Sequence, residues 1–340
     1  MVSRVGLALL LFAALVLPGC TSLGNETGDS GSEGAPTGPG AGTAAGHGAA
    51  QRSETAVVVT RENDRYYARM EITVENDFGG ASRSQVRMTT FNGGAQFFEG
   101  GNGGYVMLAQ LYGTGETEQE ARDALDILTL DASDSLALGS LTLAFTIREE
   151  TLPGSPLPIP SITGSTQNFQ NGAALRITLP GDGAHDLGGQ TTNGAVRSSG
   201  LHGPAFSGDT SNGGVSADGD FEAVTATTTN GGIDLDGTYN TVEATTSNGG
   251  ISGRLAWSRS GHATLKTSNG AIDLGLVSDD DTGFDVSAQT TNGRITLAID
   301  GDSASGNSPQ SARSPGYDSK QAKVQIDAET TNGRITIQTV

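Results

Sequence analysis

The chain of 340 residues has little of several residue types that usually indicate a protein's class. Its single cysteine, Cys20, cannot form a disulfide within the chain. Aromatic residues make up 5% of the sequence, and Trp257 is the one tryptophan. Only three of the 19 basic residues are lysines, and the formal net charge is −19. A surface this acidic repels nucleic acid and anionic lipid headgroups, so we expect neither as a partner.

The same composition is typical of a protein from a high-salt organism. Aspartate and glutamate together number 38, lysine is scarce, and threonine and alanine are abundant. An ordinary acidic surface protein is the alternative interpretation.

Long apolar runs are scarce as well. The one candidate, residues 5–17, is shorter than the roughly 20 residues that span a bilayer, and it is typical of a signal-peptide core. It ends in Leu17-Pro18-Gly19-Cys20, which resembles a lipobox, the cleavage and lipidation signal of prokaryotic lipoproteins. The resemblance implies that residues 1–20 are a signal peptide and that Cys20 carries the lipid at the mature N-terminus. The alternative is an ordinary secretory signal with an incidental cysteine.

Residues 21–54 contain mostly small and polar side chains with no apolar periodicity. Such a segment cannot bury enough apolar surface to fold, so we expect a disordered tether. A flexible coil of this length extends roughly 30 Å root-mean-square. It would hold the folded part of the chain away from a membrane surface.

An Asn-Gly pair recurs through the second half of the chain. The seven asparagines are separated by 19, 18, 18, 21, 23 and 40 residues. Threonine lies two positions before each asparagine, and threonine or serine lies one position before it. We interpret each pair as a corner of the chain, because both residues tolerate positive φ. The corners lie at Asn193, Asn212, Asn230, Asn248, Asn269, Asn292 and Asn332.

A β-branched residue follows each corner three positions later. In most copies apolar residues also recur four and six positions before the asparagine. This period of two predicts strands with one buried face. Glycine between the strands, as at Asp218-Gly219 and Asp236-Gly237, marks a second corner. The predicted core positions are Val196, Val215, Ile233, Ile251, Ile272, Ile295 and Ile335.

Two architectures fit this repeat. An up-and-down meander would use Asn-Gly as a hairpin turn, whereas a β-solenoid would stack equivalent residues of successive coils. We favour an all-β solenoid, a single-stranded β-helix with coils of 18–23 residues over 181–340, because the residues flanking the turn recur at fixed offsets too. Stacked asparagines could then bond along a ladder. Residues 301–320, within the longest spacing, predict an inserted flexible loop.

The N-terminal half, residues 55–180, predicts a small β module that contains one helix. Degenerate copies of the strand pattern surround Asn76 and Asn92. Thr117 and Glu120 form a capping-box pattern at the start of an amphipathic helix over about 117–128. Residues 141–147 alternate as a half-buried strand, and the Pro-rich residues 152–160 predict a stiff connector. We expect this module to cap the first coil of the solenoid.

The spaced T-[TS]-N-G-x-[IV] copies, the upstream ITVEN strand and the lipoprotein-like start resemble the DUF4097 family of bacterial and archaeal adhesin-like proteins. The resemblance covers most of residues 60–340. It implies a β-helical repeat domain at the cell envelope, with adhesion assigned to the family by analogy. The family supplies no established catalytic residues, and neither the helix at 117–128 nor the insertion at 301–320 belongs to its repeat.

No catalytic constellation, cofactor motif or metal motif stands out in the sequence. His47, His185, His202 and His262 are scattered, and we interpret the last three as bystanders in Gly-rich turns. Aspartates near corners, such as the pairs Asp218/Asp220 and Asp234/Asp236, are expected to be solvated. The weak candidates for a Ca²⁺ site are Asp279, Asp280 and Asp281.

These features together lead us to expect a lipid-anchored protein of the cell envelope that faces the outside or the periplasm. It would present its solenoid as an adhesin or interaction scaffold to an envelope polysaccharide or a surface protein, and would contact the membrane through the lipid on Cys20. One alternative is a β-helix enzyme that binds or cleaves polysaccharide. The other is a structural or stress-sensing component of the envelope.

Overall fold

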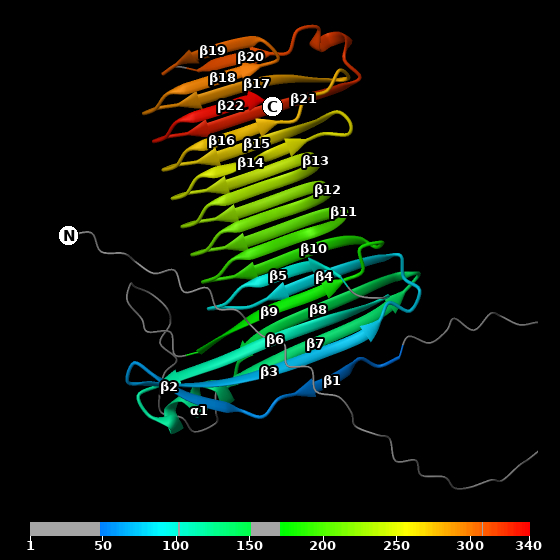
Figure 1. Cartoon of the computed structure of the whole chain (residues 1–340), viewed down its shortest axis with the longest axis vertical. Coiled ribbons are helices and arrows are strands. Elements are labelled where there is room, and N and C mark those ends of the chain that lie inside the picture. The colour runs from blue at the N-terminus through cyan, green and yellow to red at the C-terminus, as the bar shows by residue number, and fades with distance from the viewer. Residues whose placement is uncertain (1–47, 101–102, 151–170, 308) are drawn as a thin grey trace, which may run out of the picture. The chain divides into compact units, whose positions relative to one another are not determined.

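The computed structural model describes residues 48–100, 103–150, 171–307 and 309–340. They belong to one compact unit, Ala45–Val340, in which strands predominate and a single α-helix is present among the described residues (Figure 1). No helix in these ranges is long and apolar enough to cross a membrane. The predicted signal peptide, Cys20 and the Pro-rich connector at 152–160 lie outside the described residues.

The Asn-Gly repeat forms parallel strands that stack in register. Val215 lies beside Ile233, and Ile233 lies beside Ile251. Parallel neighbours identify a β-solenoid and exclude the meander, whose neighbouring strands would be antiparallel. The strands of this part are β10 (Ala184–Thr191), β11 (Val196–Thr210), β12 (Val215–Thr228), β13 (Ile233–Thr246), β14 (Ile251–Ala256), β15 (Gly261–Thr267), β16 (Ile272–Leu276), β17 (Thr282–Thr290), β18 (Ile295–Ile299), β21 (Ala322–Thr330) and β22 (Ile335–Thr339).

Each coil has two faces joined by two corners. In β12 the segment from Val215 lies on one face, Gly219 lies at the second corner, and the segment from Phe221 lies on the other face. Side chains alternate between the inside and the outside along both segments. The apolar side chains between the faces form one continuous core, in which all seven predicted core positions are at most 1% exposed.

The asparagines of the corners form a ladder of side-chain hydrogen bonds. Asn230 Nδ2 donates to Asn212 Oδ1 at 2.8 Å, and Asn248 Nδ2 donates to Asn230 Oδ1 at 2.8 Å. The ladder extends to Asn92 in the N-terminal half, which accepts from Asn193 at 2.6 Å. Eight asparagines are joined in this way, so each corner is held to its neighbour beside the backbone bonds of the strands.

The threonine that precedes each corner by two positions has a second, buried role. Thr228 is 2% exposed, and its Oγ1 donates at 2.8 Å to the carbonyl oxygen of Gly213 in the previous coil. The same bond recurs from Thr210 to Gly194 and from Thr246 to Gly231. A buried hydroxyl needs a partner, and the glycine carbonyl at a corner needs a donor, so one side chain satisfies both requirements.

The reason for glycine at these corners differs from the predicted one. Neither the seven asparagines nor the glycines that follow them have positive φ; Asn92 alone among the ladder asparagines does, at 49°. Instead, a Cβ built at Gly231 would overlap the carbonyl oxygen of Gly213 in the neighbouring coil. Glycine is therefore required because successive corners stack too closely for a side chain.

The N-terminal half continues the stack by a different chain order. The strands are β1 (Gln51–Glu54), β2 (Val58–Glu62), β3 (Arg65–Asp77), β4 (Arg83–Thr89), β5 (Ala95–Glu99), β6 (Gly104–Gly115), β7 (Leu128–Ala137), β8 (Ser140–Glu149) and β9 (Asn171–Leu179). The pair β4–β5 lies between β8–β9 and β10–β11, and all of these pairings are parallel. The corner at Asn92 is thus the first rung of the same solenoid.

Two sequence expectations fail in this half. The predicted tether extends to residue 54, but β1 pairs antiparallel with β3, so the last four residues of that range are ordered strand. The pattern around Asn76 is not a coil either, because β3 pairs antiparallel with β6. Period-two alternation identifies a strand with one buried face, but it carries no information on the direction of its neighbours.

Helix α1 (Glu118–Asp126) closes the N-terminal end of the core. It has the predicted capping box, in which Thr117 accepts from the backbone of Glu120 and the Glu120 side chain accepts from the backbone of Thr117. Ala121 and Leu125 are buried against the inner side of β6. The approach is close, because a Cβ at Gly113 in β6 would overlap the helix backbone.

At the other end the last coil in sequence is not the last coil in space. Strand β21 lies between β15 and β17, and β22 lies between β16 and β18, with parallel pairing on both sides. The ladder follows the same order, since Asn332 donates to Asn269 and Asn292 donates to Asn332. The C-terminal coil is therefore intercalated between the two coils that precede it in the chain (Figure 1).

The described residues of 301–320 form strands and a short helix, in contrast to the predicted flexible loop. They contain β19 (Asp302–Gly306), β20 (Gln310–Arg313) and the short 3-10 helix η1 (Tyr317–Ser319), while residue 308 lies outside the described range. β19 pairs antiparallel with β18, and β20 pairs antiparallel with β17. The insertion thus forms the end of the stack on both faces and covers strand edges that could otherwise pair with another chain.

Candidate functional site

The second corner, opposite the asparagine ladder, varies in length from coil to coil. The two spacings of 18 correspond to tight turns at Gly219 and Gly237, and a Cβ at Gly237 would overlap the Gly219 carbonyl. The spacing of 21 inserts a loop over residues 257–260. Trp257 anchors this loop, because its indole is 5% exposed and packs edge-on against Phe284 at 5.8 Å between ring centroids. The short coils are therefore flanked by a longer one.

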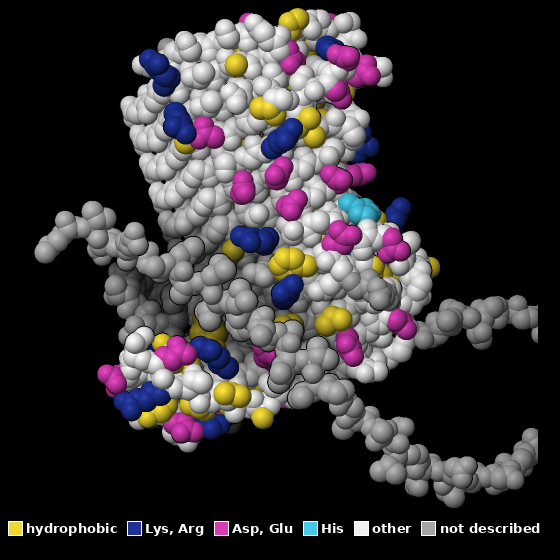
Figure 2. All heavy atoms as spheres, in the orientation of Figure 1, with side chains coloured by type: hydrophobic (Ala, Val, Ile, Leu, Met, Phe, Trp, Pro, Cys, Tyr) yellow, Lys and Arg dark blue, Asp and Glu magenta, His cyan; other side chains and the backbone are white. Residues whose placement is uncertain are grey.

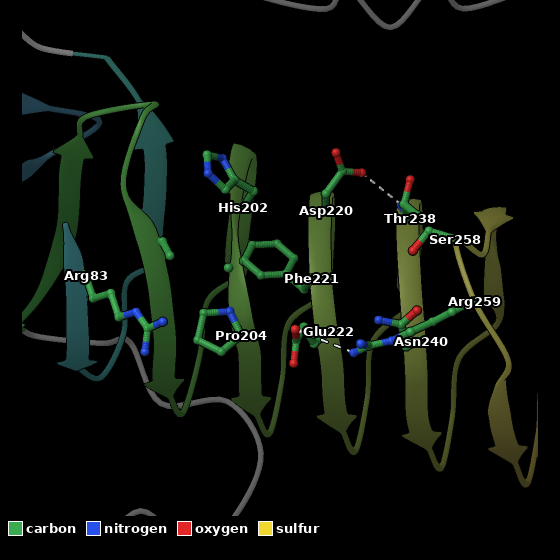
Figure 3. Close-up of a pocket in the computed structure, with 12 residues that line it drawn as sticks. Arg83, His202, Pro204, Asp220, Phe221, Glu222, Thr238, Asn240, Ser258 and Arg259 are labelled. Atoms are coloured by element: carbon green, nitrogen blue, oxygen red, sulfur yellow. Dashed lines mark hydrogen bonds and ion pairs between the residues drawn. The ribbon is translucent and has the colours of Figure 1, made fainter.

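This difference in length leaves an open groove of about 700 Å³ along the second corner (Figure 3). It runs across successive strands from β4 and β10 through β11, β12 and β13 to the 257–260 loop. Pro204 supplies its exposed apolar surface, backed by the buried ring of Phe221. Its polar lining is Arg83, His202, Asp220, Glu222, Thr238, Asn240, Ser258 and Arg259.

Arg259 is the most connected polar group of the groove. Its guanidinium lies 3.5 Å from Glu222 Oε1. With the Asn240 carboxamide turned to place its oxygen toward the guanidinium, the assignment that gives both of its ends suitable partners, that oxygen accepts from Arg259 Nε at 2.9 Å and Nη2 at 3.0 Å. These three side chains come from the loop, from β12 and from β13, so one network crosses three coils (Figure 3). These two partners restrict the orientation of the guanidinium, whose side chain is 59% exposed.

Asp220 is an exposed residue of the groove lining, and its Oδ1 accepts from the backbone nitrogen of Thr238 at 3.2 Å. In the core, Tyr239 is fully buried and its hydroxyl donates to the carbonyl of Ala217 at 2.8 Å. Burial raises the pKa of Tyr239, and the nearby carboxylates Asp218, Asp236, Asp220 and Asp234 raise it further. Tyr239 is therefore a neutral structural donor and not a proton-transfer group at neutral pH.

The other end of the groove is formed by Arg83 and His202. The Arg83 side chain is exposed and makes no hydrogen bond or ion pair with the described residues. The His202 ring is half-buried and tilts against the ring of His185, with 6.5 Å between centroids. This end therefore offers cationic and imidazole groups that are free to contact a ligand.

His185 is a core residue of a strand, and its predicted place in a Gly-rich turn is wrong. It lies in β10 with no exposed surface, where Nδ1 contacts Ser84 Oγ and Nε2 contacts the Pro180 carbonyl, both at 2.8 Å. Burial lowers the pKa of its imidazole, partly offset by the Pro180 bond. The ring is therefore neutral, with Nε2 donating to Pro180 and Nδ1 accepting from Ser84. His262 also lies in a strand, β15, and His47 lies outside the described residues.

The weak Ca²⁺ candidates form a turn. Asp279 Oδ1 accepts from the backbone nitrogens of Asp281 and Thr282 at 3.0 and 2.7 Å. Lys320 Nζ donates to the carbonyl of Asp280 at 2.7 Å, and Gln321 donates to the Asp281 carboxylate at 3.2 Å. In the described residues no three acidic, histidine or cysteine side chains gather into a group that could hold a metal.

The corner aspartates are distributed along the outside of the coils. Asp218 lies beside Asp236 in the neighbouring strand and accepts from Ser199 at 3.1 Å. Asp234 accepts from Ser252 at 3.2 Å on the next coil. Of the four, only Asp220 belongs to the groove, where it lies beside His202 of the neighbouring strand without a hydrogen bond between the two side chains.

The sequence reasoning missed the groove, although its signal was present. Spacings of 18 beside one of 21 mean that coils of unequal length lie side by side, and the extra residues must extend outward at a corner. Arg259 lies in those extra residues. What the spacing could not supply is the arrangement in which Asn240 and Glu222 face Arg259 from other coils.

Comparison with known proteins agrees with this architecture. The model of the Toastrack DUF4097 family matches residues 183–338. This part of the chain belongs to the Toastrack DUF4097 family. The match begins within the turn before β10 and ends within β22, so it includes the ladder from Asn193 onward and most of the groove. No curated protein sequence matches the chain.

Two solved structures show distant likeness to this chain. One, from Clostridium sporogenes, is provisionally described as a cell adhesion protein; it is 10% identical with a TM-score of 0.36, and the likeness covers 86% of this chain and all of that one. The other, from Bacteroides fragilis, is provisionally described as an adhesin; it is 12% identical with a TM-score of 0.28, over 79% of this chain and 97% of that one. Neither likeness is close enough to carry an argument about this chain.

Proposed function

We propose that this protein is a lipid-anchored adhesin of the cell envelope, which holds a partner on the outer surface of its solenoid without altering it chemically. The observation that carries the proposal is the polar groove across successive coils, whose side chains are held by each other and by the stacked backbone. A stack bonded through strands, threonines and asparagines is a rigid support for such a surface.

The sequence features at the N-terminus support the anchored part of the proposal. The lipobox-like Leu17-Pro18-Gly19-Cys20 would place a lipid on Cys20, and residues 21–50 would separate the membrane from the first strand. The surface also suits a protein exposed to solvent: Figure 2 shows acidic and basic side chains interspersed on one face, with hydrophobic side chains scattered between them.

The anchor is tested by the variant Cys20→Ser expressed in a prokaryotic host that processes lipoproteins. We expect the unaltered chain in the membrane fraction with the added mass of a lipid, and the variant without that mass and released from the membrane. Equal membrane retention of both, with no lipid mass on either, would show that Cys20 is not the anchor.

The binding role is tested with the full chain and purified envelope polysaccharide at high salt. Retention of the protein without release of new reducing or unsaturated sugar ends supports an adhesin. Release of new ends would overturn it in favour of a polysaccharide-cleaving enzyme. If the protein is neither retained nor active, the proposal fails and a structural role in the envelope takes its place.

A further inference from the structure

We infer that the groove binds an uncharged polysaccharide strand that lies along the axis of the stack and crosses the coils at their second corner. The inference rests on the proposed function and names its ligand class. It follows from the direction of the groove, from the kinds of side chain that line it, and from their charges.

The direction of the groove suits an extended polymer. Its lining residues come from β4, β10, β11, β12, β13 and the 257–260 loop, which lie side by side in that order (Figure 3). Neighbouring strands are about 4.8 Å apart, so five such steps correspond to roughly 24 Å. The groove is open along this line and is not an enclosed cavity.

The polar lining offers paired donors and acceptors, as sugar hydroxyls require. A hydroxyl both donates and accepts, and it is well matched by a guanidinium beside a carboxylate or carboxamide. Arg259, Glu222 and Asn240 supply this combination in a network that is already formed. The hydroxyls of Ser258 and Thr238 and the imidazole of His202 extend it along the groove.

The apolar part of the lining suits the carbon-bearing faces of sugar rings. Pro204 is exposed in the groove, and the Phe221 ring that backs it is 2% exposed, so Pro204 presents the apolar contact surface (Figure 3). The Phe221 ring is fixed by packing against Phe206, with 5.8 Å between centroids. A small rigid apolar floor between polar edges is the composition of a specific small-molecule or polymer site.

The charges of the groove favour a neutral strand over an acidic one. Two arginines, Arg83 and Arg259, are balanced by the carboxylates Asp220 and Glu222. The whole chain carries a formal charge of −19, so a polyanion is repelled on approach and gains no net attraction in the groove. An uncharged polysaccharide avoids this repulsion and still satisfies each of the fixed polar groups.

The test measures retention of the full chain on two probes, the neutral and the acidic fraction of the organism's envelope polysaccharide after separation by anion exchange. The variant Arg259→Ala removes the centre of the network, and Arg254→Ala is the matched control, because Arg254 is an exposed arginine of the same coil outside the groove. Unchanged thermal unfolding of both variants shows that each still folds.

We expect the neutral fraction to retain the unaltered chain and Arg254→Ala equally, and Arg259→Ala about tenfold more weakly or worse, as for the loss of one charge-assisted hydrogen bond. Preference for the acidic fraction, or full retention of Arg259→Ala, overturns the inference while leaving the adhesin proposal intact. Retention on neither fraction overturns both.

Discussion

At the residue scale, the two positions that follow the asparagine of each corner differ in the space they leave for a side chain. The first position after the asparagine is glycine in all seven copies, and a Cβ there would overlap the backbone of the adjacent coil. The second is Gly232 in one copy but Ala271 and Arg334 in others. A Cβ at Gly232 would be 3.6 Å from its nearest neighbour, an ordinary contact. Distance to the next coil, and not turn conformation, decides which position is restricted.

The variant Gly231→Ala should therefore destabilise the fold, by about 3 kcal/mol or more, because the coils must separate to admit the methyl group. The adjacent Gly232→Ala is the control. It should be neutral or stabilise the fold by up to about 1 kcal/mol through the lower entropy of the unfolded chain. Urea denaturation of both variants measures the difference. Equal effects would mean that the corners do not stack as closely as described.

His185 gives the stability of the fold a dependence on acid. Burial holds the pKa of its imidazole below the ordinary value near 6.5, so between the two pKa values the unfolded chain binds more protons than the folded chain. The free energy of unfolding should consequently fall as pH drops below about 6.5, and the loss should continue down to the folded pKa.

The variant His185→Gln should reduce this dependence, whereas His262→Gln, at an exposed position of β15, should retain it. Denaturant unfolding at pH ~7 and pH ~5 gives the comparison. If the two variants lose stability by the same amount over this interval, His185 is not the group responsible.

At the scale of elements, the asparagine ladder joins the coils through exposed side chains. Asn230 takes part in two rungs, and Asn292, at the end of the ladder, donates in one. Asn230→Ala should reduce the free energy of unfolding by about 1–2 kcal/mol, and Asn292→Ala by about half as much, since each net bond contributes about 0.5–1.5 kcal/mol. Urea denaturation measures the two losses. If Asn230→Ala and Asn292→Ala reduce the free energy of unfolding equally, the second side-chain bond of Asn230 does not contribute to stability.

Much of the element level could be predicted from the sequence because its determinants are local. The capping box of α1 involves residues three apart, and the alternation of β8 and of the Asn-Gly strands repeats every second residue. β1 was missed because its residues are exposed and polar, and it is a strand through its pairing with β3. Local pattern predicts where a strand lies, and its partners follow from the tertiary fold.

At the scale of the whole molecule, the order of the coils could not be predicted. Every interface uses the same contacts, an asparagine to an asparagine and a threonine to a glycine carbonyl, so Asn332 fits against Asn269 as well as Asn292 would. The repeat specifies that coils stack in register, but not which coil follows which. Residues 301–320, within the spacing of 40, predict a flexible loop, but their strands β19 and β20 pair with β18 and β17 and form the end cap.

Hydrogen exchange tests this intercalation. Amides of β21 and β22 are paired on both sides, so they should exchange slowly although they lie at the C-terminal end of the chain. β19 and β20 form the end of the stack and should exchange faster. Fast exchange throughout β21 and β22, with protected β17 and β18, would instead place the coils in chain order.

The groove arises at this scale too, because it needs a short coil beside a longer one and side chains from several coils. Its occupancy by a glycan is the central claim, and hydroxyl-radical footprinting of the full chain with and without the neutral envelope polysaccharide tests it most directly. We expect protection at the groove, at His202 and Pro204, and none at Leu138, a fully exposed side chain in the turn between β7 and β8. Protection confined to the end cap or to the asparagine corners, with an unprotected groove, would contradict the account.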